Sequence, residues 1–367
     1  MVSHAPKPSP DPTLSPPQHA ARQRPSVPRI RAAARPRAPT AIRDSHRAGS
    51  LICHPTPTGM SEVTRRLVLG TWGLAGSSVE RGRPLGYGAV SEEEAHAILD
   101  VAWATGIRWA DTAPSYGGGR GLRRLSTWQH SRGLRYACGL KCGRPIRQGV
   151  PFSDLSPHSM IAEVKASAIE VGSPRVVFVK DPPMEALEDG TVSALREILA
   201  ARWPEARTGL ATHLCELPER LLQDPPGVLQ IEYSGVNWRR AAPVVARFAQ
   251  AGWEVWAMQT LAYGWLARSE GEHREFGEDD FRATLSAHSC ALLHLISSSF
   301  FQAMMPWTQA YPRSVVALAF VLSNPAVARV VIGPRHRRHL EDIAPVARLI
   351  EDAAFGRHVH ALLNEAL

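Results

Sequence analysis

The sequence has few features of a secreted, membrane-spanning or metal-binding protein. Its 367 residues include five cysteines, and none has the paired spacing and histidine partner of a zinc site: Cys53, Cys138, Cys142, Cys215 and Cys290. We therefore expect thiols in the core or at strand ends. No apolar run approaches the ~20 residues of a membrane-spanning helix, and no apolar secretory segment follows Met1. These absences favour a cytoplasmic protein that does not bind a membrane.

Strong positive charge is also missing from most of the chain. The formal net charge is +8, but residues 1–60 hold nine Lys or Arg and two Asp, a net +7, which leaves +1 for residues 61–367. A nucleic-acid-binding fold carries a basic patch on the folded domain itself. The distribution therefore argues against a nucleic-acid partner.

Residues 1–59 differ in composition from the rest, since they contain twelve of the 30 prolines. We predict that this Pro/Arg-rich segment is disordered, because it cannot bury enough apolar surface to offset the entropy of ordering it. An organelle transit peptide is an alternative, although the prolines disfavour its amphipathic helix. Another is that translation starts at Met60. Residues 60–367, in a chain that is 44% hydrophobic, are predicted to form a single domain.

From Leu67 onward, strand-like and helix-like segments alternate. The predicted strands are 67–73, 107–111, 136–140, 175–179, 208–212, 228–233, 254–258 and 329–332. The predicted helices begin at Ser91, with Glu94 completing a capping box, and at Ser156, or span 122–130, 192–203, 239–251, 315–322 and 339–350. Residues 267–312 are predicted to be a long irregular excursion. Eight such units predict a (β/α)8 TIM barrel, and no GxGxxG motif follows the first strand to favour a doubly wound sheet.

Three side chains suited to proton transfer follow neighbouring predicted strands. Asp111 ends the second strand, Tyr116 lies on the loop beyond it, and Lys141 follows the third strand. The carboxyl ends of strands carry the chemistry of parallel α/β folds. An ammonium beside a phenol favours the phenolate, and a carboxylate keeps that ammonium charged. The phenol is therefore expected to give or take a proton near neutral pH.

The segments DTAPSYG (111–117) and GLKCG (139–143) resemble the aldo-keto reductase family. The resemblance implies a (β/α)8 barrel, a nicotinamide cofactor and a catalytic tetrad of Asp, Tyr, Lys and His. Asp111, Tyr116 and Lys141 match three members. In VVFVKDPP (176–183), Lys180 stands where the family usually has His.

The lysine at the fourth tetrad position changes the expected chemistry. Lys180 offers three donors and no acceptor, and together with Lys141 it is expected to lower the pKa of Tyr116. Either Lys180 is then the acid, or the reaction differs from simple ketone reduction. In relatives, a Glu at this position accompanies reduction of a conjugated C=C bond. Lys180 could instead pair with Asp181 or with a carboxylate or phosphate of the substrate.

The resemblance also implies where a dinucleotide binds. Gln230 matches the family's nicotinamide-binding Gln, whereas Ala211 and Thr212 replace its Ser-Asn pair and Met258 replaces a stacking aromatic. The GPRHRRHL segment (333–340) resembles the adenosine-binding stretch, and its three arginines, Arg335, Arg337 and Arg338, favour the 2′-phosphate of NADPH. The predicted cofactor-binding residues are Thr71, Trp72, Thr212, Gln230, Met258, Gln259, Thr260, Leu261, Gly264, Gly333, Arg335, Arg338 and His339.

The sequence thus predicts an NADPH-dependent oxidoreductase that reduces a small carbonyl or conjugated carbonyl compound, with Tyr116 or Lys180 as proton donor. Substrate and oligomeric state stay open. One alternative is a barrel with little turnover that serves as a cofactor-binding sensor or partner subunit. Another is an enzyme that uses the cofactor for dehydration or isomerisation. Four tryptophans are predicted to line an apolar substrate pocket or else to pack in the core: Trp72, Trp109, Trp265 and Trp307.

Overall fold

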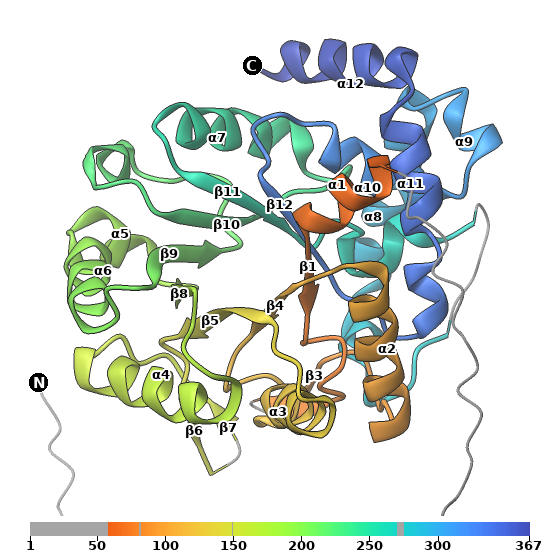
Figure 1. Ribbon diagram of the computed structural model, residues 1–367. Coiled ribbons are helices and arrows are strands. Elements are labelled where there is room, and N and C mark those ends of the chain that lie inside the picture. The colour runs from red at the N-terminus through yellow and green to blue at the C-terminus, as the bar shows by residue number, and fades with distance from the viewer. Residues whose placement is uncertain (1–57, 81, 149, 270–274) are drawn as a thin grey trace, which may run out of the picture. The chain divides into compact units, whose positions relative to one another are not determined.

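Eight parallel strands close into a barrel in the computed structural model, which describes residues 58–80, 82–148, 150–269 and 275–367 (Figure 1). The barrel belongs to one compact unit, residues 55–367. Helix α1 (Thr58–Arg66) begins two residues before the predicted start of the domain. The prediction of disorder for residues 1–59 otherwise lies outside the described residues.

The barrel strands occur close to the predicted places, and the (β/α)8 prediction is confirmed. They are β1 (Leu67–Gly70), β4 (Trp109–Thr112), β5 (Ala137–Cys142), β8 (Val176–Lys180), β9 (Arg207–Thr212), β10 (Val228–Glu232), β11 (Glu254–Met258) and β12 (Arg329–Ile332). Strand β1 pairs with both β4 and β12, which closes the sheet. Asp111 lies opposite Gly139, and Lys180 lies opposite Ala211, so the predicted tetrad positions share the carboxyl-terminal end.

Helices cover the outside of the barrel (Figure 1). Those that follow the predicted pattern are α2 (Glu92–Thr105), α3 (Arg120–Arg132), α4 (Pro157–Val171), α6 (Thr191–Arg202), α7 (Trp238–Gln250) and α10 (Arg313–Leu322). The predicted helix 339–350 is wrong at its start, since His339 lies in the 3-10 helix η4 (Arg337–Leu340) and α11 spans Ile343–Ile350. Three further helices were not predicted: α5 (Met184–Glu188), η1 (Glu219–Gln223) and α12 (Ala353–Ala366).

The predicted capping box at α2 forms only in half. Ser91 Oγ accepts the Glu94 N–H, as expected. The Glu94 carboxylate instead accepts the backbone N–H of Arg337 at 3.0 Å, from the segment after β12. Helix α2 is thereby tied to η4.

The segment 267–312 is not wholly irregular, so that prediction is wrong. It contains η3 (Phe281–Thr284), α8 (Ala287–Ala303) and α9 (Trp307–Ala310), and it follows η2 (Ala262–Ala267). Helix α8 is capped by Ser286, whose Oγ accepts the Ser289 N–H, and its last turns bury Phe300 and Phe301. Its serines and histidines interrupt the apolar spacing that would have marked a helix.

Two short hairpins add to the carboxyl-terminal end of the barrel and were not predicted. Strands β2 (Ser78–Glu80) and β3 (Arg83–Leu85) follow β1, and β6 (Ile146–Arg147) and β7 (Val150–Pro151) follow β5. The two hairpins contact each other through β2 and β7.

The barrel interior is filled, which leaves room for a ligand only beyond the strand ends. Its side chains form a buried cluster of Val68, Val176, Phe178, Ala211, Val228, Trp256, Met258 and Val331. Gly139 and Gly209 make space for it, because a Cβ on either would lie within 3.0 Å of the Phe178 ring. Trp109 packs on Trp256 with ring centroids 5.4 Å apart, so of the two roles predicted for it Trp109 has the packing role.

No helix among the described residues is both long and apolar enough to cross a membrane. The four described cysteines, Cys138, Cys142, Cys215 and Cys290, are free thiols. In the same part of the chain, no group of three or more potential ligands could hold a metal ion.

Candidate active site

The predicted Asp, Tyr and Lys form a continuous hydrogen-bonded chain at the end of β4 and β5. Lys141 Nζ donates to Asp111 Oδ2 at 2.7 Å and to the hydroxyl oxygen of Tyr116 at 2.8 Å. The strand register explains the meeting: Asp111 lies opposite Gly139, and Lys141, two residues further on, faces the same side of the sheet. All three are buried, with 2%, 3% and 8% of Asp111, Lys141 and Tyr116 exposed.

Tyr116 is a neutral phenol in this arrangement, which corrects the expectation that two ammonium groups lower its pKa. Burial raises the pKa of Tyr116 well above its ordinary value, and the positive charge of Lys141 offsets only part of the effect. Burial alone would lower the pKa of Lys141, but Asp111 and Tyr116 outweigh it and raise that pKa. The site therefore holds a charged ammonium beside a phenol that keeps its proton.

Lys180 also lies close to Tyr116, at the end of β8. Its Nζ is 5.0 Å from the centroid of the Tyr116 ring. Burial lowers the pKa of Lys180 to about 8, with Lys141 and Arg144 acting in the same direction and Asp181 opposing. The structure thus places Lys180 at the tetrad position and next to the phenol.

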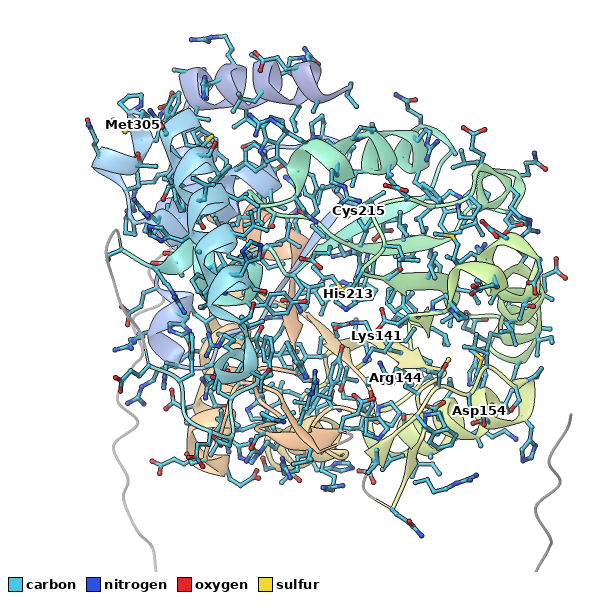
Figure 2. All side chains as sticks on the ribbon, turned by 180° about the vertical axis from the view of Figure 1, so that it is seen from behind. Lys141, Arg144, Asp154, His213, Cys215 and Met305 are labelled. Carbon is cyan, nitrogen blue, oxygen red and sulfur yellow. The ribbon has the colours of Figure 1, made fainter. Side chains whose placement is uncertain are left out.

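Asp111, Tyr116, Lys141 and Lys180 line a cavity of about 860 Å³ at the carboxyl ends of the strands. Figure 2 shows Lys141, Arg144 and His213, which all line this cavity, in the middle of the barrel view. Of the predicted cofactor-binding residues, those on its wall are Trp72, Thr212, Met258, Gln259, Thr260, Leu261, Gly264, Gly333, Arg335, Arg338 and His339. The other two, Thr71 and Gln230, are fully buried behind the wall.

Gln230 connects the proton-transfer chain to the predicted nicotinamide end. Its Nε2 donates to Asp111 Oδ1 at 3.1 Å, while its Oε1 is buried with no hydrogen-bond partner among the described residues. A buried acceptor without a donor is unfavourable. The carboxamide of a nicotinamide offers such a donor, so Gln230 fits this cofactor.

The hydroxyl groups of Thr71 and Thr212 already form hydrogen bonds within the fold. Thr71 Oγ1 donates to Thr112 Oγ1 at 2.8 Å, joining the ends of β1 and β4. Thr212 Oγ1 accepts the Leu214 N–H at 3.1 Å and keeps its own proton to donate. Thr71 therefore acts from behind the cavity wall, whereas Thr212 faces the cavity.

The loop after β11 holds an unusual backbone. Gln259, Ala262 and Tyr263 have φ values of 56°, 45° and 57°, a left-handed conformation that non-glycine residues rarely adopt. Such strain persists only where surrounding contacts enforce it, and it is concentrated at functional sites. Here Arg282 donates to the Tyr263 carbonyl at 3.0 Å and helps hold the loop.

An aromatic wall stands beside this loop. Trp72 lies 4.6 Å from Tyr87 and 5.7 Å from Phe281, between ring centroids, and Tyr263 completes the group. Of the four tryptophans proposed for a pocket, Trp72 alone lines the cavity. Trp307 packs on Phe355 instead, and Trp265 is buried.

The far end of the cavity carries the predicted phosphate-binding arginines. Arg338 is exposed, and its guanidinium forms no hydrogen bond or ion pair with another residue that the structure describes. Arg335 lies 3.9 Å from the Asp280 carboxylate. Arg337 does not line the cavity, and its backbone N–H is bound by Glu94. Two of the three arginines thus line the cavity.

One cation of the site was not predicted. Arg144, on the segment after β5, donates to Glu80 of β2 at 2.5 Å, and both residues line the cavity. The pair depends on the contact between the two hairpins, which no local sequence pattern marks. The backbone N–H of Gly143, next to it, is held by the Glu163 carboxylate of α4 at 2.9 Å.

Comparison with known proteins agrees with this description. The model of the aldo/keto reductase family matches residues 66–169. Over 73 residues, the chain is 38% identical to a D-threo-aldose 1-dehydrogenase of a Pseudomonas species, covering 17% of this chain and 22% of that protein. Over 104 residues, it is 38% identical to an L-galactose dehydrogenase of Arabidopsis thaliana, covering 26% of this chain and 31% of that protein. The chain thus matches less than a third of the length of either relative.

The solved structures extend the likeness to nearly the whole fold. A glycerol dehydrogenase of Gluconobacter oxydans superposes with a TM-score of 0.63, covering 82% of this chain and 92% of that one. The two sequences are 16% identical over this region, so the likeness is one of fold.

Proposed function

We propose that this chain, which belongs to the aldo/keto reductase family, is an NADPH-dependent oxidoreductase that reduces a small carbonyl or conjugated carbonyl compound. The observation that carries the proposal is the hydrogen-bonded chain from Asp111 through Lys141 to Tyr116 at the base of the cavity. Its phenol keeps its proton because of burial. A protonated acid beside an open cavity suits reduction, in which the carbonyl oxygen gains a proton.

Different residues around the cavity would bind the cofactor and transfer the proton. Gln230, Thr212 and Met258 would hold the nicotinamide, and Arg335 and Arg338 would bind the adenosine phosphate. When bound there, the reduced cofactor supplies a hydride. Tyr116 donates the proton to the carbonyl oxygen, and Lys141 stabilises the phenolate that results.

Lys180 is the second candidate for proton donor. Its pKa of about 8 leaves it charged at neutral pH and able to release a proton. We assign the transfer to Tyr116, because Lys141 is already bonded to its hydroxyl. Lys180 then donates a hydrogen bond to the same carbonyl oxygen.

Two of the relatives that match by sequence are named as sugar dehydrogenases, which suggests that the same site also runs in the oxidative direction. A sugar is therefore included among the candidate substrates. The reductive direction remains the proposal for a phenol that holds its proton at neutral pH.

The test is NADPH consumption measured over a panel of aldehydes, ketones and enones. Tyr116→Phe removes the acid and should lower kcat by about 10²- to 10⁴-fold. Tyr136→Phe is the matched control, since that buried phenol donates to the Leu99 carbonyl and does not line the cavity. Unchanged turnover in Tyr116→Phe would contradict the assignment. NADPH binding without turnover of any compound would instead favour the alternative function, a cofactor-binding sensor or partner subunit.

Cofactor preference has its own test. NADPH should bind more tightly than NADH, and Arg338→Gln should weaken NADPH by about 10-fold or more while leaving NADH nearly unchanged. Arg337→Gln is the control, because it removes the same charge one residue away from the cavity wall. Equal affinities for the two cofactors in the unmutated protein would exclude a 2′-phosphate site.

A further inference from the structure

Lys180 differs from the other cations at the catalytic end of the cavity in having no anion of its own. Lys141 is paired with Asp111 at 2.7 Å, and Arg144 is paired with Glu80 at 2.5 Å. No described residue forms an ion pair or hydrogen bond with Lys180. Its ammonium lies over the Tyr116 ring. A partly buried charge without a counter-ion is unfavourable.

The carboxylate next to it in sequence does not fill that role. Asp181 has a left-handed backbone, with φ of 44°, and its carboxylate lies 3.7 Å from the ring of His213. His213 is shared with Glu232, 3.2 Å away on its other nitrogen. The alternative in which Lys180 forms an ion pair with Asp181 is therefore not found.

Two further polar groups near Tyr116 lack partners. Arg144 Nε and Ser115 Oγ are both buried with no hydrogen-bond partner among the residues described, and both residues line the cavity. Each can donate one hydrogen bond, and a carboxylate has about four acceptor positions. The charge of Arg144 acts on Lys180, and Ser115 precedes Tyr116, so both residues offer further donors on the cavity wall that carries the unpaired ammonium.

We propose that the substrate is an oxo acid, in which a carboxylate bound by Lys180 lies beside the carbonyl that is reduced. The inference rests on the proposed function, because it names the substrate class of the same site. The charge balance favours a carboxylate over a phosphate, since one uncompensated cation matches one negative charge. The three protons of the ammonium can reach both the carboxylate and the adjacent carbonyl oxygen. Lys180 is thus a specificity-determining residue as well as a donor.

The first test compares two compounds that share a carbonyl and differ in charge, benzoylformate and benzoylformamide. The wild-type protein should show a higher kcat/KM for the carboxylate, although the amide is the more electrophilic ketone. Lys180→Met should lower the ratio of the two values by about 10- to 100-fold, the effect of losing a hydrogen bond to a charged group. Lys180→Arg should keep most of the ratio, because it keeps the charge. A ratio that does not depend on residue 180 would overturn the inference while leaving the proposed reductase intact.

A binding measurement separates the inference from turnover. Benzoylformate should raise the melting temperature of the wild-type protein more than benzoylformamide does, and Lys180→Met should abolish that difference. If neither compound is reduced but this pattern appears, the anion site stands and the proposed function fails. If benzoylformate stabilises both proteins equally, the anion site is excluded.

The pH dependence provides a third readout. The preference for benzoylformate should be complete at pH 7 and fall as the pH rises through about 8, where Lys180 loses its charge in the free enzyme. The charges of Asp181, Lys141, Arg144 and Asp111 also act on Lys180. The remaining neighbour is Glu163, whose pKa burial raises to about 7, so its ionisation precedes that of Lys180. Lys180→Arg should show no such fall up to pH 10, because a guanidinium stays charged.

Discussion

The pair formed by Lys141 and Asp111 is the most consequential contact at the scale of single residues. Both charges are almost completely removed from water, and each is needed to compensate the other. Replacing a buried pair as a whole is often tolerated, whereas removing one member leaves a charge buried alone. The same pair also determines whether Tyr116 has an ammonium at its hydroxyl, so stability and chemistry depend on one interaction.

We expect Asp111→Asn to lower the free energy of unfolding by about 3–5 kcal/mol, because it leaves the Lys141 ammonium without a carboxylate. The double variant Asp111→Asn/Lys141→Met should lose less than the sum of the two single variants. Urea unfolding of the four proteins measures this coupling.

The control for that cycle is a pair on the surface. Arg240 and Glu216 lie 3.2 Å apart with 73% and 83% of their side chains exposed, so neutralising either should cost at most about 1 kcal/mol. Additive losses at Asp111 and Lys141, within the error of the surface cycle, would contradict a compensated buried pair.

At the scale of elements, the contact between α2 and η4 links the outside of the barrel to the proposed phosphate end. Glu94 accepts the Arg337 N–H at 3.0 Å and lies 3.6 Å from His336. It thereby holds the backbone between Gly333 and Leu340, which carries Arg338. Loss of this hydrogen bond should weaken cofactor binding, because it no longer fixes the backbone that carries Arg338.

We predict that Glu94→Ala weakens NADPH binding by about 5- to 10-fold, the effect of losing one positioning hydrogen bond. Glu93→Ala is the matched control, since it removes an exposed acid from the same first turn. Both should lower the melting temperature slightly through the helix dipole. Equal changes in NADPH affinity for the two variants would show that Glu94 does not position the segment.

The elements also explain what could be predicted from sequence. Apolar runs mark the strands, and parallel strands bring their carboxyl ends together, so Asp111, Lys141 and Lys180 could be placed before the structure was known. The pairing of Arg144 with Glu80 could not, because it depends on two hairpins too short to show a period. The direction of the Tyr116 pKa was also predicted wrongly, since sequence indicates which charges are near but not how deeply the phenol is buried.

At the scale of the whole molecule, the packing of the barrel determines where charge can be placed. Phe178 and Trp256 fill the interior, with ring centroids 5.4 Å apart. The buried charges of Asp111, Lys141 and Lys180 therefore gather at the carboxyl-terminal ends of β4, β5 and β8, where the cavity begins. The rest of the core holds phenols and thiols whose pKa values are raised by burial. The stability of the whole fold therefore depends on pH.

Stability should fall at alkaline pH. Burial raises the pKa of three thiols, Cys138 to about 12, Cys142 well above its ordinary value, and Cys215. It also raises the pKa of Tyr87, Tyr116, Tyr136, Tyr233 and Tyr263. These groups keep their protons in the folded state and ionise in the unfolded state. A group with a raised folded pKa contributes stability below its unfolded pKa and loses it as the pH rises. The lowered pKa of Lys180 makes the free energy of unfolding rise between pH 8 and 10.5. Lys180 is one group, however, and several thiols and phenols act in the opposite direction.

The free energy of unfolding should therefore decrease above about pH 9 by roughly 1.4 kcal/mol per pH unit for each ionising thiol. The decrease should steepen above about pH 10, when the tyrosines begin to ionise in the unfolded chain. Urea unfolding in reducing buffer at pH 7.5, 8.5, 9.5 and 10.5 measures it. Cys138→Ala/Cys142→Ala/Cys215→Ala should move the onset from the thiol range to the tyrosine range, whatever its effect at pH 7.5. A stability that stays constant to pH 10.5 in the wild-type protein would mean that these thiols and phenols ionise as readily in the fold as in water.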